Sequence, residues 1–128
     1  MYPSGSAQIT VLIPLPLFYN QDKHGQCHPV EDEKFIVTAD EISRKFGGGV
    51  LHLFKDESPK GFWWNKGILN QDELAVLEVD IFDTDGNRKW IKSYARDVLL
   101  KRFCQDAIYI KFIGPIETLE VTEETITS

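Results

Sequence analysis

The chain has 128 residues, 42% hydrophobic and 27% charged, with a formal net charge of −6 at pH 7. This length suits one hydrophobic core, and the composition excludes a chain that is disordered throughout. Four acids lie in a C-terminal stretch without Lys or Arg, and no basic stripe occurs elsewhere, so nucleic acid is disfavoured as a partner.

Cys27 and Cys104 are the two cysteines of the chain. They do not amount to a disulfide framework, so we expect reduced thiols, and their pairing stays open. Residues 1–8 lack the basic start of a signal peptide, and the apolar run 11–18 is too short to cross a bilayer. We therefore expect a cytoplasmic protein without a membrane partner.

After a flexible N-terminus over residues 1–7, the first strand is expected to start at Gln8. Its odd positions, Ile9 to Leu17, are all apolar, which is typical of a strand with one buried face. Pro14 and Pro16 remove two backbone donors from the same edge. The second half of this strand is therefore predicted to extend beyond its neighbour on that side.

A polar connection over 19–34 has no periodicity, as is typical of functional or mobile loops. Thr38, followed three residues later by Glu41, has the spacing of a capping box and predicts that a helix begins there. This short helix is expected to end after Phe46, where Gly47 can supply a left-handed cap.

Strands are predicted at 50–54 and 73–82, the second followed by a turn at 83–87. Residues 61–67 are expected to continue a bent strand or to form the next one. Apolar residues at spacings of three and four predict a helix over 91–103, and the period then changes to two over 108–113, which predicts a strand. A break is expected at Gly114-Pro115, then a short edge strand at 117–121. Residues 122–128 read as a disordered acidic tail.

The element order is strand, helix, two strands, helix and strand. This βαββαβ order predicts a ferredoxin-like α+β domain over residues 8–121, in which two helices cover one face of an antiparallel sheet. The opposite face then carries side chains that either meet a partner or stay exposed to water.

The polar connection contains His24, Cys27 and His28, three residue types that bind zinc. Structural zinc sites use four ligands, usually as two separated pairs, and the second pair is missing from the sequence. We therefore expect no metal and no cofactor, with these three residues as the weaker alternative.

Aromatic residues cluster in Lys60-Gly61-Phe62-Trp63-Trp64, which resembles the opening of an RNA-stacking motif for five residues. Because the cluster precedes the strong strand and the chain is acidic, buried or interface aromatics are the preferred interpretation. The predicted binding residues are those expected on the helix-free sheet face: Trp63, Trp64, Phe82 and Tyr109.

Glu78 and Asp80 share one face of the 73–82 strand, and His52 lies on a strand expected nearby. Two carboxylates and a histidine within hydrogen-bond reach can perform acid/base catalysis. Exposed acids are also common on the solvent face of a sheet, which is the preferred interpretation.

The segment 38–113 resembles a small uncharacterised family of bacterial and phage-associated ferredoxin-like domains. The resemblance rests on Phe46-Gly47-Gly48-Gly49, Gly61 with Trp63 or Trp64, the acidic strand around Glu78, and the passage from helix to strand in Lys101-Arg102-Phe103-Cys104-Gln105-Asp106-Ala107-Ile108. It implies the same fold and assigns no catalytic residue.

These observations favour an intracellular, non-enzymatic binding or regulatory domain that acts through an aromatic sheet face, by self-association or on another protein. The alternative is a small dimeric α+β-barrel enzyme in which His52, Glu78 and Asp80 act on a small molecule. No P-loop, nucleotide-binding fingerprint or nucleophile elbow supports the enzyme.

Overall fold

A computed structural model describes residues 7–53 and 58–125 of the chain. Its elements, in chain order, are β1 (Gln8–Pro16), α1 (Asp32–Phe46), β2 (Val50–His52), β3 (Lys60–Asn65), β4 (Ile68–Phe82), α2 (Asp85–Tyr94), the π-helical turn η1 (Ala95–Leu99), α3 (Leu100–Arg102), β5 (Lys111–Ile116) and the 3₁₀ turn η2 (Glu123–Thr125). Residue 54, the predicted end of the 50–54 strand, lies outside the described residues.

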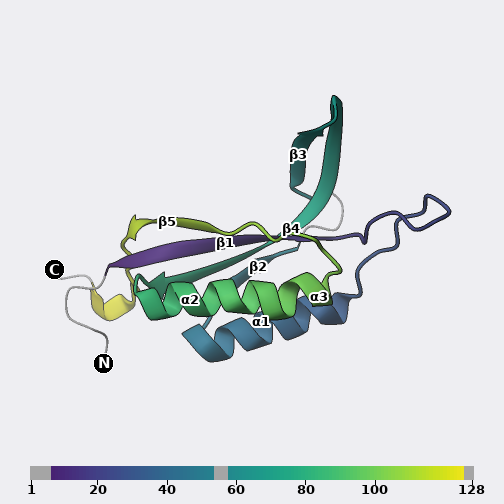
Figure 1. Cartoon of the computed structure of the whole chain (residues 1–128). Helices are drawn as coiled ribbons and strands as arrows, with labels where there is room; N and C mark the ends of the chain where they lie inside the picture. The colour runs from purple at the N-terminus through teal and green to yellow at the C-terminus, as the bar shows by residue number, and fades with distance from the viewer. Residues whose placement is uncertain (1–6, 54–57, 126–128) are drawn as a thin grey trace.

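The sheet has the order β2-β4-β1-β5, with every neighbouring pair antiparallel, and β3 pairs with β4 outside this path. The sheet is curled, and α1 and the helical rod from α2 to α3 lie together on one of its faces (Figure 1). This confirms an α+β fold with helices on one face. The residues of β3, expected to continue a bent strand or to form the next one, form a separate strand that the order βαββαβ does not include.

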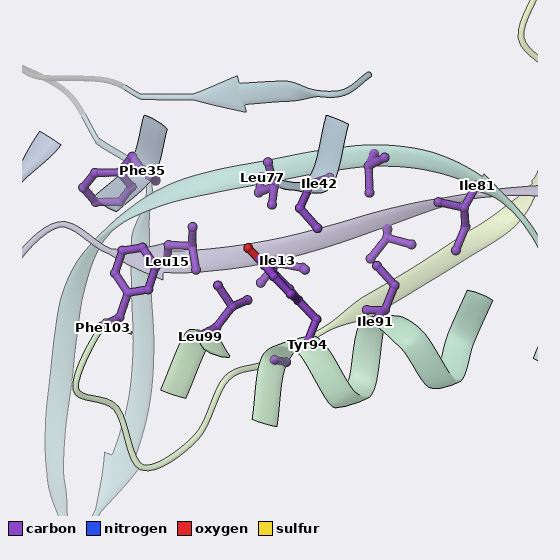
Figure 2. Close-up of a cluster of buried hydrophobic side chains, with 14 of the residues drawn as sticks. Ile13, Leu15, Phe35, Ile42, Leu77, Ile81, Ile91, Tyr94, Leu99 and Phe103 are labelled. Atoms are coloured by element: carbon purple, nitrogen blue, oxygen red, sulfur yellow. The ribbon is translucent and has the colours of Figure 1, made fainter. Parts of the chain in front are cut away.

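The core lies between the sheet and the helices. Its members are the inward-facing side chains of β1 and β4, which alternate along each strand, and the apolar stripes of the helices (Figure 2). They include Ile9, Val11, Ile13, Leu15, Ala75, Leu77, Val79 and Ile81 from the sheet and Phe35, Ile42, Ile91, Leu99 and Phe103 from the helical side.

The effect predicted for the two prolines of β1 is confirmed. β1 pairs with β4 along its whole length, from Gln8 to Pro16, but with β5 only from Gln8 to Leu12. The N–H of Leu17 donates to the Glu73 carbonyl on the β4 side at 3.0 Å, so odd-numbered positions direct their backbone groups toward β4. Even-numbered positions of β1, which include both prolines, therefore direct theirs toward β5. Pro14 lacks the donor on that side, and the β5 pairing has ended before it.

The predicted start of the first helix is wrong. α1 begins at Asp32, six residues before Thr38, and the Thr38 side chain is fully buried in mid-helix. Asp32 and Glu33 occupy the first turn, where the helix dipole favours negative charge. Phe35 and Thr38 share the buried face of α1. The row of core-facing side chains therefore begins one helical turn before Thr38, the residue predicted to cap the helix.

The predicted end of this helix is confirmed. Gly47 follows Phe46 with φ of 91°, the left-handed conformation that glycine adopts without a steric penalty. Its N–H donates to the Ser43 carbonyl at 2.7 Å and so satisfies one carbonyl of the last turn.

The second helical rod begins earlier than its apolar stripe suggests. Thr84 is the N-cap of α2, and its hydroxyl accepts a hydrogen bond from the N–H of Asn87 at 3.1 Å, so the predicted turn at 83–87 is the start of a helix. The rod runs on through η1, whose wider π turn lies between α2 and α3.

The predicted break at Gly114-Pro115 is also wrong, because both residues lie within β5. A β-bulge between Gln8 and Thr10 accommodates them, and the peptide bond between Gly114 and Pro115 is cis. Gly114 packs directly against β1: a Cβ atom here would lie 2.5 Å from the Ile9 side chain. The close approach requires glycine.

The C-terminal part differs from the prediction as well. Residues 117–121 form no strand, and Glu123–Thr125, predicted to be disordered, form the turn η2. The rest of the predicted tail, 126–128, and residues 1–6 of the predicted flexible N-terminus lie outside the described residues. Within the described part of the chain, no helix combines the length and apolar character needed to cross a membrane.

Candidate functional site

The most distinctive feature of the fold is a hairpin that projects from the sheet on the side away from the helices (Figure 1). It consists of β3 and the first residues of β4, and we call it the arm (residues 60–73). Lys66 and Gly67 form its two-residue turn with φ of 53° and 78°. Two successive positive φ angles are typical of a type I′ turn, whose twist matches that of paired strands.

The arm carries large apolar side chains outside the core. Phe62, Trp64 and Leu69 share one face, because Trp64 lies opposite Leu69 and Phe62 is two residues from Trp64. Their exposed fractions are 60%, 72% and 52%. Trp63 and Ile68 project from the other face and are also exposed. Such a concentration of exposed apolar surface is typical of interaction sites.

The outer edge of β3 is also available for pairing. Among the described strands β3 pairs with β4 alone. The Pro59 carbonyl accepts a hydrogen bond from the N–H of Leu74 in β4 at 2.9 Å. Because the backbone groups of successive residues in a strand point to opposite edges, Gly61 and Trp63 also direct their N–H and carbonyl groups to β4. The N–H groups of Phe62 and Trp64 therefore point to the open edge.

The polar connection predicted over 19–34 ends where α1 begins at Asp32, and the segment 17–30 is ordered by its own hydrogen bonds. The N–H of Tyr19 donates to the His28 carbonyl and that of Val30 to the Leu17 carbonyl, both at 2.8 Å. At the tip, the Asp22 carboxylate accepts from the N–H groups of residues 24 and 26, which lowers the pKa of Asp22. The connection is thus a hairpin-like loop, and we call it the 17–30 loop.

A groove of about 510 Å³ lies between the 17–30 loop and the base of the arm. Its walls combine three aromatic rings with amides and carboxylates, which come from two segments about fifty residues apart in sequence. The lining residues are Phe18, Tyr19, Asn20, Gln21, Cys27, Trp63, Gln71, Asp72 and Glu73. This volume falls in the range typical of small-ligand sites.

The two carboxylates of the groove differ in their surroundings. Lys60 donates to Glu73 Oε1 at 2.8 Å, and this hydrogen bond lowers the pKa of Glu73. The Asp72 carboxyl group has no hydrogen bond or ion pair within the described part of the chain, and partial desolvation raises its pKa. Asp72 is therefore an exposed carboxyl group that pairs with no cation among the described residues.

A polar network behind the groove joins the two helical rods. Arg102 lies 2.6 Å from Glu41 Oε1, and its Nη1 donates to Thr38 Oγ1 at 2.8 Å. The hydroxyl of Tyr94 donates to Glu41 Oε1 at 3.0 Å; burial and this hydrogen bond raise the pKa of Tyr94 to about 12. Lys34 continues the network, because its Nζ donates to the Arg102 carbonyl at 2.7 Å.

Lys34 also connects this network to the groove. Its ammonium group lies 4.9 Å from the centroid of the Tyr19 ring, and Glu31 accepts a hydrogen bond from the Tyr19 hydroxyl. The position of Tyr19 on the groove wall is therefore fixed by contacts with the first turn of α1.

The structure separates the four predicted binding residues. Trp63 and Trp64 lie on opposite faces of the arm. Phe82 is the last residue of β4, roughly 40 Å of strand path from Leu69 in the arm. Tyr109 is 75% exposed in the segment that joins α3 to β5. The arm thus contains half of the predicted set.

The three predicted acid/base residues lie on the helix-free face. His52 Nε2 is 3.2 Å from Glu78 Oε1, whereas Asp80 accepts a hydrogen bond from the Thr10 hydroxyl at 2.7 Å. Neither the groove beside the 17–30 loop nor a smaller one of about 270 Å³ between α1 and β2 is lined by any of the three.

The three weaker metal-ligand candidates lie in the 17–30 loop. His28 Nε2 is 3.0 Å from Asp22 Oδ2, and Cys27 lines the groove as a free thiol. His24 donates its backbone N–H to Asp22. The described residues contain no group of three or more His, Cys, Asp or Glu side chains placed to share a metal ion.

Sequence reasoning missed the groove and Asp72. The groove forms where the 17–30 loop meets the arm, and no local pattern links Phe18 to Asp72. One signal was available: Trp64-Asn65-Lys66-Gly67-Ile68 has apolar residues on both sides of a Gly-containing turn, which is typical of a hairpin.

Comparison with models of known protein families gives no match, and comparison with curated proteins gives none either.

Proposed function

We propose that this protein is a non-enzymatic binding domain that acts by self-association through the arm. The single observation that carries the proposal is the exposed apolar face formed by Phe62, Trp64 and Leu69 next to a strand edge that pairs with no described strand. An edge strand with exposed apolar side chains is a template for pairing with another chain.

A second copy is the partner that the arm suits best. Two β3 edges related by a two-fold axis would run antiparallel, so the outward N–H groups of Phe62 and Trp64 would meet carbonyls of the same strand in the other copy. The apolar faces of both arms would then lie side by side in one four-stranded sheet. Each arm would cover the exposed edge of the other.

The charges of the chain agree with this arrangement. The net charge is −6, which disfavours contact between most parts of two copies. Between residues 61 and 71 the sequence contains one charged residue, Lys66, and no acid. The arm is therefore the part of the chain where two acidic copies approach with the least repulsion.

We also propose that the fold is a ferredoxin-like βαββαβ domain with the arm as an added hairpin. In support, β1, β2, β4 and β5 have the order β2-β4-β1-β5 with antiparallel neighbours, and the helical segments connect them in the expected sequence. On this proposal the arm is an elaboration of the connection between two paired strands, outside the common core.

The test is sedimentation velocity of the wild-type protein and of arm variants over a range of concentrations. We expect the wild type to sediment increasingly as a dimer, and Phe62→Thr/Trp64→Thr to weaken the dimer at least about tenfold, because two large apolar side chains are lost from the interface. Leu119→Thr, which removes an exposed apolar residue away from the arm, is the matched control and should leave the dimer unchanged.

A second pair of variants tests the edge itself. Phe62→Pro and Phe62→Thr both remove the ring, but only proline removes the outward N–H, which the β3–β4 pairing does not use. Phe62→Pro should therefore weaken the dimer further than Phe62→Thr. A wild type that remains monomeric at every concentration would contradict self-association and favour a different protein as the partner of the arm.

A further inference from the structure

We propose that the groove between the 17–30 loop and the arm binds an alkylammonium group, either of a small free amine or of a lysine side chain. The inference rests on the combination of Phe18 and Trp63 rings with the Asp72 and Glu73 carboxylates in one cavity of about 510 Å³. It goes beyond self-association and does not depend on it.

The aromatic wall is the first part of the argument. Phe18 and Trp63 line the groove and are both partly exposed, so their rings are open to a bound group. Organic cations bind to the faces of aromatic rings because the ring quadrupole attracts positive charge. Tyr19 already holds the Lys34 ammonium at 4.9 Å from its ring centroid, an example of this contact within the same wall.

The charge of the groove is the second part. None of its nine lining residues is Lys, Arg or His, and two are acids. Lys60 compensates Glu73 through a 2.8 Å hydrogen bond, whereas Asp72 has no such partner among the described residues. Within residues 7–53 and 58–125, the lining therefore carries one negative charge that no cation pairs with, and it disfavours an anionic ligand.

The surroundings of Asp72 are the third part. Asp72 is exposed at the groove, and partial desolvation by its neighbours raises its pKa. A cation bound nearby would stabilise the carboxylate, and the ring of Trp63 would cover the alkyl part of the ligand. An alkylammonium group offers a positive charge for the Asp72 carboxylate and apolar carbon for the Trp63 ring.

The test compares two probes of the same shape, choline and 3,3-dimethylbutan-1-ol, by NMR titration of the full chain. The second probe replaces the quaternary nitrogen with carbon and is uncharged. We expect choline to bind with a dissociation constant on the order of millimolar and the alcohol to bind at least about fivefold more weakly, because it loses the cation–π and carboxylate attraction.

Variants assign the contacts. Asp72→Asn and Trp63→Leu should each weaken choline binding about fivefold, the first by removing the charge and the second by removing the ring while keeping an apolar side chain. Asp106→Asn, which removes an exposed acid outside the groove, is the control and should leave binding unchanged. Thermal unfolding of each variant checks that its fold is intact.

Equal affinity for the two probes, no binding of choline, or full binding by Asp72→Asn would overturn the proposal. A further comparison identifies the source of the amine. Tighter binding of the blocked peptide Gly-Ser-Lys-Ser-Gly than of n-butylamine assigns the site to a lysine side chain of a protein, and the reverse order assigns it to a free small amine.

Discussion

Phe103→Ala is expected to lower the free energy of unfolding by about 3–5 kcal/mol, the loss typical of removing a buried phenylalanine ring. Phe103 is fully buried, and its ring centroid lies 5.3 Å from that of Phe35. The two rings join the end of the α2–α3 rod to the start of α1 and lie beside Leu15 of β1 (Figure 2).

Urea unfolding followed by circular dichroism measures this loss. Phe103→Leu is the matched control, because leucine retains most of the apolar volume and should cost clearly less. A loss below about 1 kcal/mol for the alanine variant would mean that the contact between the two rods does not depend on this ring.

The second large effect is a loss of stability at alkaline pH that depends on Tyr94. Its pKa is about 12 in the folded protein, whereas an unfolded chain has a value near the ordinary 10. Below pH 10 the hydroxyl is protonated in both the folded and the unfolded protein, so its contribution to the free energy of unfolding is fully present. As pH rises from 10 toward 12 the unfolded chain loses its proton first, and the free energy of unfolding falls by about 2–3 kcal/mol.

Chemical unfolding at a series of pH values measures this fall, and Tyr94→Phe should remove the part that belongs to Tyr94. Tyr109→Phe changes an exposed tyrosine and is the control, so it should follow the wild-type profile. The account of the network of Tyr94, Glu41 and Arg102 would fail if wild type and Tyr94→Phe lost stability equally over this range.

The periodic elements were predictable because burial imposes a pattern on the sequence. The odd positions of β1 face the core, and the stripe that includes Ile91 and Leu99 follows the inner side of the second rod. The effect of Pro14 was also predictable, because a missing donor affects one edge of a strand regardless of the rest of the fold.

The wrong predictions, for the start of α1 and for the break at Gly114, occur where a short sequence pattern is compatible with two different structures. Thr38 and Glu41 have capping-box spacing, but Thr38 is buried in mid-helix and Glu41 pairs with Arg102, far away in sequence. Gly114 was interpreted as a break, but it is a glycine because β1 approaches closely. These contacts between distant segments were not visible in either local pattern.

The candidate site was predictable only in part. The aromatic cluster at Phe62 to Trp64 indicated an interaction surface, and the arm exposes it. Its position outside the sheet depends on the turn at Lys66-Gly67 and on the length of β4, which the prediction began five residues too late, at Glu73. The groove depends on the meeting of this arm with the 17–30 loop, a tertiary contact without a sequence signature.

The most direct test of self-association through the arm is amide hydrogen exchange, measured residue by residue at low and high protein concentration. We expect exchange of the Phe62 and Trp64 amides, which point to the open edge of β3, to slow as the concentration rises. The amides of Gly61 and Trp63 already pair with β4 and should change less. Rates at Phe62 and Trp64 that stay the same at all concentrations would contradict the proposed interface.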